Sequence, residues 1–142
     1  MMLLSSHVAL SCKDPLVSER YYTHYFGFQR ARVIPLGDEQ IIFIKSGATY
    51  LELFQSKGET QLPPFQNDGP TYPGLRHIAF QVENVDQKLV DMGADAHITL
   101  GPLDFNDFIP GWRSVWLADP DGNIVEVSQG YVDQENPPQL VG

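Results

Sequence analysis

Short stretches of alternating apolar and polar residues follow one another along the first third of the chain. Such alternation is typical of β-strands with one buried face. After the first stretch, Asp14 precedes Pro15, and Gly27 follows a run of aromatic residues, which predicts a capped helix between these two ends. The pattern therefore predicts a strand, a helix and three further strands, with the strands at residues 7–12, 28–35, 40–45 and 49–55.

The same order of elements returns in the second half of the chain. A strand is predicted at residues 75–82, and Asn84 caps a helix over residues 85–92 that ends at Gly93. Gln87 stands three residues after Asn84, as in a capping box. Three more strands are predicted at residues 96–100, 113–118 and 124–129, with a loop over 101–112. A repeated β-α-β-β-β order is a fold-level signal, and it predicts an α+β protein.

The repeat divides the chain into parts. We expect one domain over residues 1–142, with a first module at 7–55 and a second module at 75–130. Residues 56–74 contain four prolines, which disfavour regular structure, so this segment is predicted to be a linker. Residues 131–142 are predicted to be a loosely held tail.

Composition and charge exclude several classes of protein. The 142 residues are 42% hydrophobic and 19% charged, which is typical of a globular domain. With 18 acidic and nine basic residues, and no basic run, the chain is not expected to bind nucleic acid. No apolar run approaches a membrane span, and the N-terminus does not resemble a signal peptide. The single cysteine fits a reducing compartment, so we expect a cytoplasmic protein without a membrane partner.

Each module carries one histidine in its first strand and one glutamate in its last. These residues are His7 and Glu52 in the first module, and His77 and Glu126 in the second. The apolar neighbours of each glutamate point to the opposite face of its strand, because strand side chains alternate. If the apolar faces pack on the helices, all four polar side chains project from the other faces of the sheets.

Two imidazoles and two carboxylates form a suitable set of ligands for Ni, Zn, Co, Fe or Mn. A carboxylate set into a sheet is also costly without a cation nearby. For one isolated residue, a solvated sheet face is the simpler explanation. Because the four residues occur in register across a repeat, the sequence favours a divalent metal site made of His7, Glu52, His77 and Glu126.

The chain resembles the vicinal oxygen chelate superfamily, which includes glyoxalase I, extradiol dioxygenases, fosfomycin-modifying enzymes and bleomycin resistance proteins. The Asp-Pro-Asp-Gly-Asn turn that precedes the last strand is the most specific matching motif. The matching segments are residues 7–10, 22–28, 51–53, 74–80 and 119–126. The resemblance implies two βαβββ modules that form a cup-shaped mixed sheet around a metal, with the four residues above on the family's metal positions.

The ligand set is most similar to that of bacterial glyoxalase I. This similarity implies a metal-dependent lyase or isomerase that moves a proton next to a carbonyl of a small molecule, through a metal-bound enediolate. Glu126 is the first candidate for the base and Glu52 the second. The resemblance also implies a homodimer, and the pattern leaves open whether the metal site forms within one chain or between two.

Two positions depart from glyoxalase I. Its glutathione-binding arginine and asparagine are replaced by Ser11 and Ser56, so lactoylglutathione is not the expected substrate. Two alternatives belong to the same superfamily. One is an Fe(II) dioxygenase, against which the fourth ligand counts. The other is a drug-binding resistance protein without catalysis, against which the full ligand set counts.

Three further residues are candidates for substrate binding. His97 alternates with apolar residues in a predicted strand, Phe108 lies in an aromatic loop, and Arg113 begins the strand that follows. Arg113 and Trp116 differ in strand parity, so at most one of them faces the cup. Cys12 shares its parity with the apolar positions of the first strand and is predicted to be a core thiol.

Overall fold

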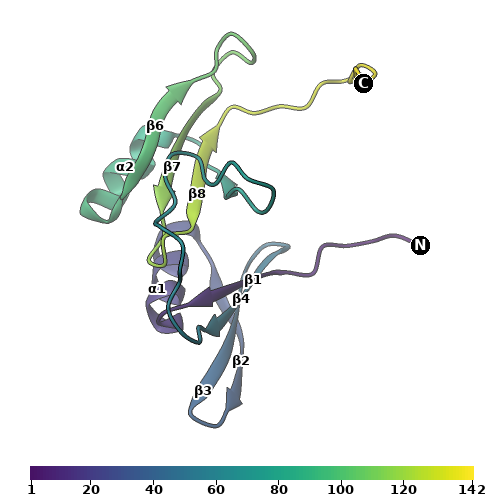
Figure 1. The fold of residues 1–142 in the computed structure, drawn as a ribbon. Helices are drawn as coiled ribbons and strands as arrows, with labels where there is room; N and C mark the ends of the chain where they lie inside the picture. The colour runs from purple at the N-terminus through teal and green to yellow at the C-terminus, as the bar shows by residue number, and fades with distance from the viewer.

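The computed structural model describes residues 1–142, and it contains the β-α-β-β-β order twice (Figure 1). The first module consists of β1 (Val8–Cys12), α1 (Pro15–Phe26), β2 (Gln29–Leu36), β3 (Glu39–Ser46) and β4 (Thr49–Gln55). The second consists of β5 (Ile78–Gln81), α2 (Val85–Met92), a short 3₁₀ turn η1 (Gly93–Asp95), β6 (Ile98–Asp104), β7 (Arg113–Ala118) and β8 (Ile124–Gln129). No helix is long and apolar enough to cross a membrane.

Each module forms its own four-stranded mixed sheet. The strand orders are β1-β4-β3-β2 and β5-β8-β7-β6, so the second sheet repeats the topology of the first. In each, the first strand runs parallel to the last, and the other neighbours are antiparallel. The predicted fold class is confirmed. No strand of the first sheet is hydrogen-bonded to a strand of the second, so the predicted mixed sheet consists of two separate four-stranded sheets within one chain.

Both helices begin and end where the sequence predicts. Asp14 accepts a hydrogen bond from the Leu16 backbone N–H, and Asn84 accepts one from the Gln87 backbone N–H. Gly27 ends α1 in the left-handed conformation at φ 69°. The capping box at Gln87 is only half formed, because its side-chain amide donates to Asp91 in the next turn of the helix.

Two strands depart from their predicted bounds by three or more residues at one end. β5 begins at Ile78 instead of residue 75, because its neighbour β8 begins only at Ile124, after the turn at residues 119–123. Leu75 therefore has no partner strand and is 70% exposed. β6 continues to Asp104, beyond the predicted end at residue 100, because register shifts absorb the Gly-Pro pair and preserve pairing with β7.

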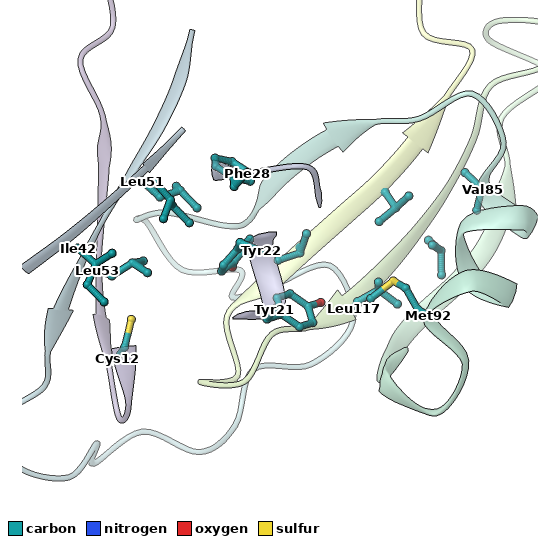
Figure 2. Close-up of a cluster of buried hydrophobic side chains, with 14 residues drawn as sticks. Cys12, Tyr21, Tyr22, Phe28, Ile42, Leu51, Leu53, Val85, Met92 and Leu117 are labelled. Carbon is teal, nitrogen blue, oxygen red and sulfur yellow. The ribbon is translucent and has the colours of Figure 1, made fainter. Parts of the chain in front are cut away.

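The helix-facing sides of both sheets merge into one hydrophobic core, shown in Figure 2. Leu51 and Leu53 enter this core from β4, and Val125 and Val127 enter from β8. Tyr22 of α1 lies between the two sets and is fully buried. The predicted inward faces of the last strands are confirmed, and both glutamates consequently lie on the sides of the sheets away from the core.

The turn at residues 119–123 fastens the second module to the first. The Tyr22 hydroxyl donates to Asp119 Oδ2 at 2.6 Å, and the Ser18 hydroxyl donates to Asp121 Oδ2 at 2.9 Å. The Lys13 backbone N–H donates to Asp121 Oδ1 at 2.7 Å. Burial raises the pKa of Asp119, while the bonds from Tyr22 and Asn123 lower it. The most specific sequence motif therefore has a structural role between the modules.

Cys12 is fully buried, and burial raises the pKa of its thiol to about 11. Only about one molecule in a thousand carries the reactive thiolate at pH 8. We expect the folded protein to remain unmodified by iodoacetamide at pH 8 over minutes, whereas the denatured chain takes up one equivalent. Mass spectrometry checks this, and rapid labelling of the folded protein would contradict the core position of Cys12.

Candidate functional site

In the first module, His7 and Glu52 form a close pair on the face of the sheet that is turned away from the core. His7 lies just before β1, and Glu52 lies in β4 opposite Ala9. His7 Nε2 is 3.1 Å from Glu52 Oε1, and the Glu52 side chain is only 14% exposed. Phe43, the partner of Glu52 in β3, contacts the His7 ring edge-on.

The second module repeats this arrangement with His77 and Glu126. His77 Nε2 is 3.0 Å from Glu126 Oε1, and Glu126 lies in β8 opposite Ala79. Trp116, the partner of Glu126 in β7, faces the His77 ring at a centroid distance of 6.3 Å. The Ser114 hydroxyl donates to Glu126 Oε2 at 2.9 Å and fixes the carboxylate from its other side.

Both histidines use the same nitrogen to face their glutamate, because Nδ1 is engaged elsewhere. Nδ1 of His77 is 2.6 Å from the Asp68 carbonyl oxygen, and Nδ1 of His7 is 2.9 Å from the Ser6 hydroxyl. A carbonyl oxygen only accepts hydrogen bonds, so Nδ1 of His77 carries the proton. Histidine ligands of metals are commonly oriented by such a bond.

The lone pair on Nε2 of His77 indicates what His77 and Glu126 can bind together. In neutral His77, Nε2 presents this lone pair to a carboxylate oxygen 3.0 Å away. Two such acceptors repel each other unless a cation lies between them or a second proton binds. Two ligand atoms about 2.1 Å from one ion, at a right angle, are separated by about 3.0 Å. Both pairs therefore fit the demands of a divalent metal.

The four predicted ligands form two separate pairs instead of one group of four. Within one chain, no group of three or more histidine, cysteine or acidic side chains is close enough to hold a metal ion. His7 meets Glu52, and His77 meets Glu126. One chain thus presents two separate His–Glu pairs on two separate sheets.

The three predicted substrate-binding residues do not contact either pair. The Arg113 guanidinium binds Asp86 of α2 and Asp104 of β6, and these bonds raise its pKa. Its side chain therefore points to the helix side, and Trp116 occupies the site face instead. His97 lines a groove beside α1, and Phe108 is 78% exposed in the loop between β6 and β7.

Sequence reasoning missed the groups that position the two pairs. Ser114 shares the parity of Trp116 and could have been found by extending the strand alternation to β7. The Asp68 carbonyl carries no side-chain signal, because any residue of the linker offers the same atom. Its position follows only from the path of residues 56–74 past His77.

Ser11 and Ser56, which replace the glutathione-binding residues, line one open pocket at the ends of β1 and β4. This pocket has a volume of about 540 Å³ and no hydrophobic lining residue. Lys13 and Lys57 also line it, as does Asp121 from the turn that fastens the modules. The surroundings of the two serines are thus polar and of mixed charge.

Comparisons with known proteins support the fold and the repeat. An uncharacterized protein, YwkD, of Bacillus subtilis (strain 168) is 30% identical in an alignment of 125 residues that covers 84% of this chain and 93% of that protein. The solved structure of a glyoxalase family protein from Enterococcus faecalis is 28% identical, with a TM-score of 0.65 over 87% of this chain and 95% of that one.

The fosfomycin resistance protein FosX from Listeria monocytogenes has a similar fold. Its structure superimposes with a TM-score of 0.69 over 93% of this chain and 97% of that one, at 18% identity. A family model matches residues 5–127, which include both His–Glu pairs and all eight strands except the end of β8. The chain therefore belongs to the Glyoxalase/Bleomycin resistance protein/Dioxygenase superfamily.

Proposed function

We propose that this chain is a divalent-metal-dependent lyase or isomerase of glyoxalase I type that moves a proton next to a carbonyl of a small molecule. The observation that carries the proposal is the pair of matched His–Glu contacts, at 3.1 and 3.0 Å, on equivalent strands of the two modules. Nickel, zinc, cobalt, iron and manganese all accept this donor set. FosX, which shares the fold, has been solved in complex with Mn(II) and sulfate.

Each His–Glu pair is proposed to be one half of a metal site, and the separation of these two half-sites leads to the proposed assembly. Four ligands cannot meet within one chain unless the two sheets rearrange, and the shared core around Tyr22 opposes such a rearrangement. In a twofold homodimer, the first module of one protomer faces the second module of its partner. Each of the two sites then contains His7 and Glu52 from one chain and His77 and Glu126 from the other.

The residues of this chain supply binding and proton transfer. A divalent ion held by His7, Glu52, His77 and Glu126 would supply Lewis-acid stabilisation of the negative charge that develops on the substrate oxygens. Glu126 is the proposed base, and Glu52 is the alternative. The Ser114 hydroxyl holds one oxygen of Glu126 in place, and Trp116 and Phe43 form apolar walls that restrict water near the two pairs.

The shared site makes a direct prediction for mixed dimers. The variants His7→Ala/Glu52→Gln and His77→Ala/Glu126→Gln should each bind no metal, because every site in either homodimer loses half of its ligands. After subunit exchange at equal amounts, half of the dimers contain one of each chain, and each of these has one intact site. Metal binding should therefore return to about a quarter of the wild-type level.

Metal analysis after exchange and dialysis measures this recovery. Each variant incubated alone under the same conditions serves as the control. Absence of recovery, although mass spectrometry detects mixed dimers, would contradict a site shared between protomers. Stoichiometric metal in a monomeric wild-type protein would contradict the assembly itself.

A further inference from the structure

A second cavity lies away from both His–Glu pairs, between α1 and the second module. Its volume is about 340 Å³, within the range of about 300–1,000 Å³ that is usual for small-molecule sites. Arg20, Tyr21 and His24 line it from α1, and Asp95 and His97 line it from the segment before β6. The remaining walls are largely apolar.

Three basic side chains at this groove, those of Arg20, His24 and His97, form no ion pair. Of the five arginines, Arg30, Arg76 and Arg113 form ion pairs, whereas Arg20 does not. No side-chain hydrogen bond is formed by His24 or His97. Asp95, the one acidic residue of the lining, forms no ion pair with any of the three. They make the groove a candidate site for an anion.

Tyr21 lines the groove, but its hydroxyl is not accessible from it. The residue is 8% exposed, and its hydroxyl oxygen is buried without any hydrogen bond. Burial also raises the pKa of Tyr21, so the hydroxyl keeps its proton. The polar groups that a ligand in the groove can reach are therefore those of Arg20, His24, His97 and Asp95.

The single acid of the groove restricts the charge of a ligand. Asp95 already accepts a hydrogen bond from the Tyr25 hydroxyl, and its carboxylate repels a second negative charge. Apolar walls require an apolar body on the ligand. One negative charge with an apolar body therefore matches the groove better than a phosphate or a dicarboxylate does.

We propose that this groove binds a small monocarboxylate, with Arg20 and His24 or His97 as donors. The site is separate from the proposed metal site, since its lining includes none of the four proposed ligands. Its position between α1 and the second module places the ligand at the junction that sets the relative orientation of the half-sites.

Calorimetric titration of the full chain with benzoate, and with uncharged benzamide, tests this proposal. Benzoate should bind at least about tenfold more tightly than benzamide, as expected for a charge-assisted hydrogen bond. Arg20→Gln should weaken benzoate binding at least about tenfold, while Arg32→Gln, which alters the other unpaired arginine, should leave it unchanged.

Several results would overturn the proposal. One is no heat at benzoate concentrations up to about 20 mM, which excludes even a millimolar site. Another is equal binding of benzoate and benzamide. A third is that Glu126→Gln abolishes benzoate binding while Arg20→Gln leaves it intact. This result would assign benzoate to the proposed metal site instead. Because the readout is benzoate affinity, it is independent of whether the His–Glu pairs bind metal.

Discussion

Glu126→Gln is expected to lower affinity for a divalent metal by more than about 100-fold, and to lower activity in proportion. Removal of a group that only hydrogen-bonds to a metal ligand already lowers metal affinity by about 10–100-fold. Glu126 is proposed to be a ligand itself, so its loss should have a larger effect. The substitution keeps the shape of the side chain but removes its charge. Titration with Mn(II), Ni(II) and Zn(II), together with metal analysis of the purified protein, measures the loss.

Although Glu126→Gln should weaken metal binding, it should not lower the stability of the metal-free protein. The new amide donates a hydrogen bond to Nε2 of His77, where the wild type places two acceptors 3.0 Å apart. The metal-free variant should therefore unfold at a temperature no lower than the metal-free wild type. This result separates loss of a ligand from loss of structure.

Two further variants complete the test. Ser114→Ala removes the hydrogen bond to Glu126 Oε2, together with the bond between Ser114 and Ser128, and should weaken metal binding by about 10-fold. Glu83→Gln removes an exposed carboxylate near the same module and should have no effect. Near-stoichiometric metal in purified Glu126→Gln would overturn the assignment of Glu126 as a ligand. Activity that survives in Glu126→Gln but not in Glu52→Gln would transfer the role of base to Glu52.

Asp119→Ala is expected to lower the free energy of unfolding by about 3–5 kcal/mol, because several buried donors lose their acceptor together. Asp119 is 5% exposed. It accepts hydrogen bonds from the Tyr22 hydroxyl, the Asn123 side chain, and the backbone N–H groups of Asp121 and Asn123. Since Tyr22 belongs to α1, the loss also loosens the junction between the modules.

Urea unfolding followed by circular dichroism measures this effect. Asp119→Asn retains one oxygen for the two backbone donors and should cost only about 1–2 kcal/mol, so it reports on the junction even if the alanine variant does not fold. Asp38→Ala removes an exposed carboxylate in the turn between β2 and β3 and should change stability by less than about 0.5 kcal/mol. Equal stabilities for Asp119→Ala and Asp38→Ala would show that the turn does not fasten the modules.

The linker at residues 56–74 contacts His77 and Arg76 in the second module, and its composition does not reveal these contacts. Its prolines predict irregular structure, which is observed. Its contribution to the site is the Asp68 carbonyl, which selects the tautomer of His77. The adjacent Asp68 carboxylate binds Arg76, and this bond lowers the pKa of Asp68. The linker thus holds the residue before His77 as well as His77 itself.

The sequence by itself determined the order of the elements, the helix caps and the faces on which Glu52 and Glu126 lie. These features depend on side-chain period and on residues a few positions apart, so they are written into local sequence. The repeat added the equivalence of His7 with His77, which no single strand could have provided. It also predicted one histidine in the first strand of each module, whereas His7 and His77 lie directly before β1 and β5.

Only the tertiary structure decided how the modules sit together and which groups complete each pair. Sequence reasoning placed Arg113 and His97 beside the pairs, but the register of β7 turns Arg113 to α2, and the packing of α1 against the second module takes His97 into another groove. The two His–Glu pairs remain apart because the turn at residues 119–123 and the core around Tyr22 join the modules through their helix sides. Such contacts join residues about a hundred positions apart, and no local pattern encodes them.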